Sequence, residues 1–163
     1  MDKREIVEKK ILDSVGLDRM LAFWRFKGLK VAMAYGTFDG LKPGAIDMLF
    51  QAANKGSVLL VAVKPDDVVK KHKGEGNPSF NQCNRATMVA SQLLVSAVYL
   101  VEVEDPTELI QKVQPVALAC CMNAADIEVE AFEQVKNWKG EFIQVDTSKT
   151  LEPYMGSGCG CEG

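Results

Sequence analysis

Residues 30–45 are Lys30-Val-Ala-Met-Ala-Tyr-Gly-Thr-Phe-Asp-Gly-Leu-Lys-Pro-Gly-Ala45. The run from Lys30 to Tyr35 is almost wholly apolar, which is typical of a strand buried on both faces of a sheet. It continues into a segment with three glycines, an aspartate and a Pro-Gly pair, and Pro43 suits the first turn of a helix. The stretch therefore predicts a strand, a tight turn and a helix in immediate succession.

The same alternation continues along the chain. Further strands are predicted at 58–63, 97–101, 116–120 and 141–145, and helices at 45–54, 84–94, 106–113 and 127–137. The first 28 residues are expected to be helical with a break at Gly16 and an N-cap at Asp18, and residues 64–81 to be mostly loop with one turn of helix. Five such strands indicate an α/β fold, a Rossmann-like five-stranded parallel sheet with helices on both faces.

Ligands of such sheets bind beyond the carboxyl ends of the strands, at the point where the strand order reverses. This rule places the site after Tyr35, with contributions from the residues after Val63 and Cys120. Backbone N–H groups and the helix dipole near Gly44 favour an anion there, most naturally a phosphate. Alternatively, the glycines of this segment serve only its tight turns.

The composition limits the class of protein. The chain has 163 residues, 47% hydrophobic and 25% charged, as in an ordinary globular domain, and its net charge of −3 argues against a general nucleic-acid binder. No apolar stretch approaches the ~20 residues of a membrane span, and no apolar signal-peptide region follows the charged first residues. The five cysteines are odd in number and scattered, which fits a reducing cytosol. We therefore expect a cytoplasmic domain without membrane or nucleic-acid partners.

The segment after the first strand resembles a known family signature. In the cytidylyltransferase-like nucleotidyltransferases, G-x-F-D-x-x-H-x-G-H follows the first strand, and four of its positions are matched here, at Gly36, Phe38, Asp39 and Gly44. Lys73-Gly-Glu-Gly-Asn-Pro78 resembles the K-G-E-G-R-P loop of that family, and Arg85 falls where a helix-borne arginine follows it. With the Trp24-containing helix before the first strand, the resemblance covers about residues 17–145 and is strongest to the heptose 1-phosphate adenylyltransferase type.

The resemblance implies transfer of a nucleotidyl group, AMP or CMP, from a nucleoside triphosphate to a sugar- or polyol-phosphate, with Mg²⁺ on the triphosphate. Lys42 and Arg85 are the implied catalytic cations, and the implied nucleotide- and phosphate-binding residues are Tyr35, Gly36, Thr37, Phe38, Asp39, Gly44, Lys73, Thr147 and Ser148. No metal-ligand cluster of the protein itself is expected, and the favoured assembly is a homodimer. The chain then divides into N-terminal helices (1–28), a nucleotidyltransferase-like domain (29–150) and a flexible Gly/Cys tail (151–163).

The sequence departs from the family where catalysis is concentrated. The two motif histidines, which stabilise the charge of the departing pyrophosphate, are replaced by Lys42 and Ala45. Lysine still neutralises phosphate, but alanine donates nothing, and loss of one such donor commonly costs about 100- to 1000-fold in rate. Ala119-Cys-Cys-Met-Asn123 replaces a lysine-containing strand end, and Pro153 follows Thr147 and Ser148 too soon for the usual helix. Two hypotheses stay open: an impaired nucleotidyltransferase, or an inactive module of the same fold that binds nucleotide or a partner.

Simpler roles compete for several residues. Lys42 is as compatible with solvated surface as with a phosphate contact. The run Lys70, Lys71 and Lys73 is interpreted as solvated surface, and His72 as an exposed loop residue rather than a catalytic base. Asp39 is an alternative helix cap. Cys120 and Cys121 are expected to pack as small hydrophobic residues. A third hypothesis is a scaffold whose cysteine tail transfers metal or thiols to a partner protein. It is the weakest, because Cys159 and Cys161 supply at most half of the ligands of a tetrahedral zinc site.

Overall fold

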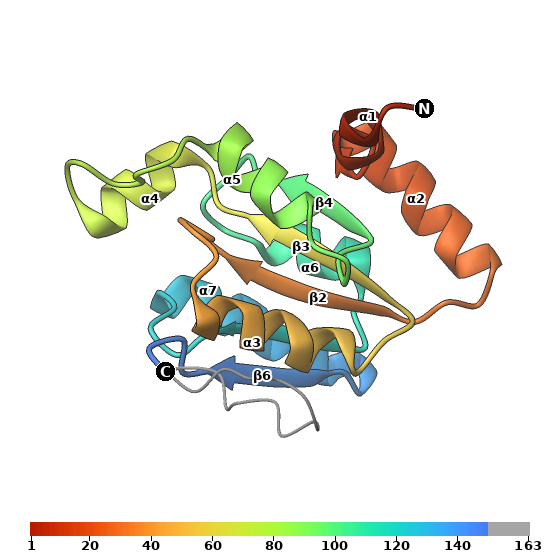
Figure 1. Cartoon of the computed structure of the whole chain (residues 1–163). Coiled ribbons are helices and arrows are strands. Elements are labelled where there is room, and N and C mark those ends of the chain that lie inside the picture. The colour runs from red at the N-terminus through yellow and green to blue at the C-terminus, as the bar shows by residue number, and fades with distance from the viewer. Residues whose placement is uncertain (150–163) are drawn as a thin grey trace, which may run out of the picture.

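The computed structural model describes residues 1–149, which form one parallel sheet of six strands covered by helices on both faces (Figure 1). The strand order is β1-β4-β3-β2-β5-β6. The strands are β1 (Ile11–Leu12), β2 (Val31–Gly36), β3 (Val58–Val63), β4 (Ala97–Leu100), β5 (Ala117–Cys121) and β6 (Glu141–Val145). The helices are α1 (Lys3–Glu8), α2 (Ser14–Phe26), α3 (Pro43–Ala53), α4 (Asp66–Lys73), α5 (Gln82–Ala90), α6 (Thr107–Val113), α7 (Asp126–Glu133) and the 3₁₀-helix η1 (Gln134–Trp138).

The strand that opens the family motif lies at the centre of the sheet. β2 pairs with β3 from Val31 to Gly36 on one side and with β5 on the other. Every residue from Val31 to Tyr35 is buried, which confirms the interpretation of this run as a strand covered on both faces. The strand order reverses at β2, so its carboxyl end is the switch point at which ligands of open α/β sheets bind.

Successive side chains of each strand enter different layers of the core. Met33 and Tyr35 belong to a layer with α2, α6 and α7, whereas Ala32 and Ala34 belong to a layer with α3 and α5. This division follows from the two-residue period of a strand. Trp24 of α2 is buried in the first layer, so the N-terminal helix is part of the core rather than an appendage.

The N-terminal region differs from the expected helices. Ile11 and Leu12 form an extra edge strand that pairs with Val98 and Tyr99 of β4, so the sheet has six strands instead of the five expected. A run of two apolar residues is too short to show the periodicity that distinguishes a strand from a helix. Only the pairing with β4 shows that these residues form a strand. Gly16 lies inside the first turn of α2 and does not break the helix.

The N-cap of α2 is also different from the one expected. The Asp13 carboxylate caps the helix and accepts a hydrogen bond of 2.7 Å from the Gly16 amide, so the expected cap at Asp18 is wrong. Asp18 lies one turn further into the helix. The end of the helix is as expected, because Gly28 adopts a left-handed conformation (φ 67°) directly after it.

Residues 64–81 contain more helix than the sequence indicated. α4 has two turns, with acidic Asp66 and Asp67 in the first and Lys70–Lys73 in the last. This charge order complements the helix dipole, and Val68 and Val69 anchor the helix in the interior. No helix within residues 1–149 is long and apolar enough to cross a bilayer. The Gly/Cys tail at 151–163, with Cys159 and Cys161, lies outside the described residues.

Candidate active site

A cleft of about 640 Å³ lies at the carboxyl ends of the central strands. Its wall contains most of the residues expected from the sequence: Tyr35, Gly36, Thr37, Phe38, Asp39, Lys42, Lys73, Thr147 and Ser148. The other lining residues come from α3, from Lys64 after β3, from the β5–α7 segment and from Asp146. The fold therefore brings segments far apart in sequence to the switch point of the sheet.

Gly44 allows the last of these segments to approach α3. A Cβ atom at position 44 would lie 2.0 Å from the backbone oxygen of Thr147, which no side chain tolerates. The backbone after β6 therefore crosses directly over the first turn of α3, and Ala45 and Lys42 line the cleft beside it. The glycine of the motif serves a close backbone approach here rather than only a turn.

Asp39 fixes the segment after α4 to the motif. Its two carboxylate oxygens accept hydrogen bonds from the backbone amides of Ser79 (2.7 Å) and Phe80 (2.9 Å). Partial desolvation raises the pKa of the Asp39 carboxyl, but these two hydrogen bonds and the charges of Arg85 and Lys73 outweigh it, so the pKa lies below its usual range. The carboxylate caps neither α3 nor α5, whose N-cap residues are Lys42 and Asn81.

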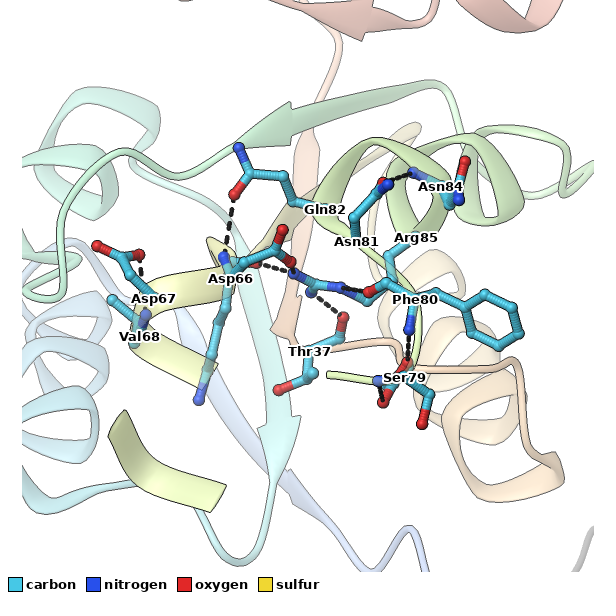
Figure 2. A network of polar contacts seen from close by, with 12 residues as sticks. Thr37, Asp66, Asp67, Val68, Ser79, Phe80, Asn81, Gln82, Asn84 and Arg85 are labelled. Atoms are coloured by element: carbon cyan, nitrogen blue, oxygen red, sulfur yellow. Dashed lines mark hydrogen bonds and ion pairs between the residues drawn. The ribbon is translucent and has the colours of Figure 1, made fainter. Parts of the chain in front are cut away.

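Arg85 lies behind the cleft rather than in its wall. The side chain of this α5 residue is fully buried, and Figure 2 shows its guanidinium among backbone and carboxylate oxygens. Its nitrogens donate to the backbone oxygens of Phe80 (2.9 Å), Thr37 (2.6 Å) and Lys64 (2.8 Å), and to Oδ1 of Asp66 (2.7 Å). A guanidinium occupied in this way holds together the ends of β2 and β3 and the segment before α5, and it is not presented to a ligand in this conformation.

Lys42 and the lysines of the charge run at 70–73 separate into two groups. Lys42 and Lys73 line the cleft, and Lys42 is the N-cap residue of α3 and makes no side-chain capping bond. Lys71 instead forms an ion pair of 2.6 Å with Glu104, and Lys70 pairs with Glu75. The solvated-surface interpretation of the charge run therefore fits Lys70 and Lys71, while Lys73 is placed at the cleft.

His72 belongs to α4 and not to a loop. Its Nε2 atom lies 2.9 Å from Oε1 of Glu104, an orienting carboxylate that the sequence spacing gave no means of finding. Glu104 contacts Lys71 as well, and none of the three residues lines the cleft. The contact of His72 with Glu104 therefore belongs to the surface of α4.

Three charged residues that line the cleft were not predicted from the sequence, namely Lys64, Glu128 and Asp146. Lys64 follows β3, and its Nζ atom lies 2.5 Å from Oε1 of Glu128 and 5.5 Å from the centre of the Tyr35 ring. The Glu128 side chain is 1% exposed, and its Oε2 atom accepts from the amide of Ala125 at the start of α7. A signal for Lys64 was available, because it follows a buried strand of the sheet, but nothing local indicated that Glu128 turns inward.

The cysteines of β5 differ in environment. Cys120 is buried, and desolvation, followed by the charges of Cys121 and Glu128, raises the pKa of its thiol to about 12. This confirms its expected packing as a small hydrophobic residue. Cys121 is half-buried and lines the cleft, where its sulfur accepts from the amide of Asn123.

A second, more open hollow of about 800 Å³ is lined by residues of β1, of β4 and of the start of α4. It is lined by Asp13, Asp66, Asp67 and Glu102 over an apolar floor from β1 and β4, so its charge is acidic. It has neither the glycines nor the helix N-terminus of the motif. The cleft at the end of β2 therefore has the chemistry of an anion site, and the acidic hollow does not. Within residues 1–149, no three His, Cys, Asp or Glu side chains are grouped to hold a metal ion.

Comparison with known proteins agrees with this geometry. Residues 33–155 match the family model described as cytidylyltransferase-like. The chain is 36% identical over 140 residues to the bifunctional protein HldE of Nitrobacter winogradskyi, and 37% identical over 123 residues to that of Caulobacter vibrioides. These matches cover 85% and 76% of the chain but only 29% and 25% of the relatives, so the chain spans less than a third of their length.

Solved structures show the same fold at lower identity. A lipopolysaccharide core biosynthesis protein from Thermoplasma volcanium superposes with a TM-score of 0.63 at 20% identity, covering 77% of this chain and all of the other. A pantoate–β-alanine ligase from Francisella tularensis superposes with a TM-score of 0.56 at 14% identity, covering 88% of this chain and 68% of the ligase.

Proposed function

Because the chain belongs to the cytidylyltransferase-like family, we propose that it binds a nucleoside triphosphate in the cleft and transfers its nucleotidyl group to a phosphorylated small molecule. The observation that carries this proposal is the first turn of α3. There Gly44 lies under the backbone of Thr147, and Lys42 and Lys73 line the same cleft. A helix N-terminus with lysine side chains beside it is a site for the phosphates of a nucleotide.

In this reaction an oxygen of the acceptor phosphate attacks the α-phosphorus, and the bond from that phosphorus to the β-phosphate oxygen breaks, so pyrophosphate leaves. The protein contributes position and charge more than covalent chemistry. Lys42 and Lys73 neutralise the phosphate oxygens, and Lys42 takes the charge that develops on pyrophosphate. Arg85 acts as a positioning residue, since it holds the backbone of Thr37 and Lys64 at the edge of the cleft.

Mg²⁺ fits the site as a companion of the triphosphate. It prefers oxygen ligands and keeps several waters, so the phosphates themselves supply most of its coordination. The carboxylates that line the cleft are those of Asp39, Glu128 and Asp146, and Asp39 and Asp146 already accept hydrogen bonds from Ser79 and Ser148. When bound, the ion would add charge neutralisation at the phosphates, while the residues of this chain orient them.

Turnover is expected to be slow. Ala45 lines the cleft where the family motif has a histidine, and it offers no hydrogen bond to the leaving group. Removal of one such donor lowers the rate by about 100- to 1000-fold in other enzymes. The second candidate is therefore a catalytically inactive module that retains the cleft and binds nucleotide or a partner protein.

Thermal unfolding with ATP, CTP, GTP or UTP, each with and without Mg²⁺, tests the proposal. A ligand at 100 times its dissociation constant stabilises the folded state by about 2.7 kcal/mol, which is easily measured. We expect selective stabilisation by one triphosphate and slow pyrophosphate release when a sugar phosphate is added. Selective binding without pyrophosphate release would support the inactive module, and the absence of binding at millimolar concentration would contradict nucleotide binding in either form.

A further inference from the structure

Among residues 1–149, two buried side-chain polar atoms lack a hydrogen-bond partner, Tyr35 Oη and Glu128 Oε1. Both residues are 1% exposed, and both line the cleft. Buried polar groups are almost always hydrogen-bonded, because leaving one unpaired costs about 1–3 kcal/mol. Glu128 Oε1 has the Lys64 ammonium as an ion-pair partner, so Tyr35 Oη is the buried atom that a polar ligand in the cleft would complete.

Lys64 lies at the same place. Its ammonium is 2.5 Å from Glu128 Oε1, in an ion-pair contact outside hydrogen-bonding geometry, and its side chain is 15% exposed. An ammonium has three donors, so contact with one carboxylate oxygen leaves donors for a ligand in the cleft. Glu128 holds the ammonium and cancels its charge until a ligand arrives. We call Tyr35, Lys64 and Glu128 the floor triad.

The floor triad is separate from the phosphate site at α3. Tyr35 packs against Phe132 of α7, with ring centres 5.1 Å apart, in the core layer of α2, α6 and α7. Met48 of α3 belongs to the other core layer, on the opposite face of the sheet. The cleft therefore has lysine donors at two separate places, with the end of β2 between them, and it can hold two polar groups of its ligands at once.

We propose that the floor triad is the subsite for the acceptor and that it selects a small hydroxylated anion. Lys64 and the Tyr35 hydroxyl donate to the anionic group, and Glu128 accepts from a neighbouring hydroxyl of the same molecule. A phosphate and a carboxylate both meet this requirement, so the shared chemistry is an anionic oxygen next to an alcohol. The proposal rests on the proposed function in one respect, because it identifies the acceptor of that reaction.

The test uses NMR titration of the whole chain, without nucleotide, with glycerol 3-phosphate, glycerate and glycerol. The variants are Tyr35→Phe, which removes one hydroxyl, and the double variant Lys64→Met/Glu128→Gln. The double variant leaves no unpaired buried charge, as Lys64→Met alone would. The matched control is Lys55→Met/Glu141→Gln, which removes a surface ion pair of 2.9 Å outside the cleft.

We expect wild type and control to bind at least one of the two anions, with amide shifts at Lys64 and Glu128, and not to bind glycerol. In the double variant the affinity should fall by about tenfold or more, the loss expected when hydrogen bonds to a charged group are removed. Preference for glycerol 3-phosphate or for glycerate identifies the anionic group.

Equal affinity of the double variant and the wild type would overturn the proposal, as would shifts confined to Lys42 and Lys73. The absence of binding of either anion by wild type at tens of millimolar would also overturn it. This titration is independent of the triphosphate panel. Anion binding at the floor triad without triphosphate binding would support the subsite and contradict the proposed reaction. Triphosphate binding without anion binding at the floor triad would contradict the subsite and support the proposed reaction.

Discussion

At the scale of single residues, Lys42 and Ala45 decide how fast the proposed reaction runs. Both line the cleft at the first turn of α3. Replacing both by histidine, as Lys42→His/Ala45→His, is expected to raise pyrophosphate release by about 100-fold, because a shaped donor of transition-state charge returns. The measurement is pyrophosphate release with the triphosphate that binds best, and Ala45→Gln, which adds a side chain without an imidazole, is the control. Unchanged release would show that the pocket is altered beyond these two positions.

Gly44 is the residue at which an added methyl group should be least tolerated. In Gly44→Ala the new Cβ would lie 2.0 Å from the Thr147 oxygen, so the backbone after β6 must move away. We expect a loss of about 1–3 kcal/mol in the free energy of urea unfolding, as for overpacked interiors, together with weaker triphosphate binding. Gly16→Ala is the comparison, since its Cβ would meet a side-chain oxygen at 3.0 Å, and it should cost less. Equal costs would contradict the close approach.

Substitution of Arg85 is expected to lower the stability of the fold, because its side chain binds protein oxygens rather than a ligand. Arg85→Met removes donors to three backbone oxygens and leaves Asp66 without its partner. We expect the free energy of unfolding to fall by about 3 kcal/mol or more, because a bond to a charged group contributes about 1.5–3 kcal/mol. Urea unfolding measures this, with Arg25→Met as a surface control. A loss below about 1 kcal/mol would contradict the positioning role.

At the scale of elements, the segment between α4 and α5 is held to the motif by the ionised Asp39. Its pKa is lowered in the folded protein, so its contribution to stability is complete above the ordinary aspartate pKa of about 3.9 and is lost as the pH falls through the folded value. The difference in unfolding free energy between wild type and Asp39→Asn should therefore become smaller as the pH falls from about 7 to about 3, because the carboxylate becomes protonated at the lower end of that range.

The control for this pH dependence is Asp146→Asn. Asp146 also has a lowered pKa, but through its hydrogen bonds with Ser148 and not through bonds from the amides of Ser79 and Phe80. In Asp39→Asn the amides of Ser79 and Phe80 should exchange faster with solvent at neutral pH, whereas Asp146→Asn should leave them unchanged. A constant difference in stability across the pH range would contradict the role of the Asp39 charge.

At the scale of the whole molecule, the second N-terminal helix, α2, is part of the core. Leu17, Leu21 and Trp24 are buried against the sheet, while α1 has no buried residue. Deletion of residues 1–28 removes these side chains and β1, and each large core side chain contributes about 2–5 kcal/mol. Since whole domains are stable by about 5–15 kcal/mol, the shortened chain is expected not to fold.

Deletion of residues 1–9 is the matched control for this prediction. It removes α1 but keeps β1 and α2, so cooperative unfolding in urea should remain. Circular dichroism and amide dispersion in NMR spectra report the outcome for both deletions. A folded chain beginning at residue 29 would show that the N-terminal helices and the domain of residues 29–150 are independent.

The sequence by itself determined the sheet and the place of the site. The apolar runs at β2, β3 and β5 are covered on both faces and have no polar side to present, so they fit the interior of a parallel sheet. The motif from Gly36 to Gly44 then marks the carboxyl end of β2, because glycines and Pro-Gly have local backbone preferences that act without distant contacts.

Only the tertiary structure decided which residues meet at that site. Ile11 and Leu12 form a strand because β4 offers an edge. Arg85 turns inward because oxygens of Thr37, Lys64 and Asp66, from segments before α5, converge on it. The Lys64–Glu128 pair joins residues 64 positions apart. Such pairs cannot be predicted from the local sequence. A buried charge is stable only beside a partner of opposite charge, and the whole fold determines where that partner lies.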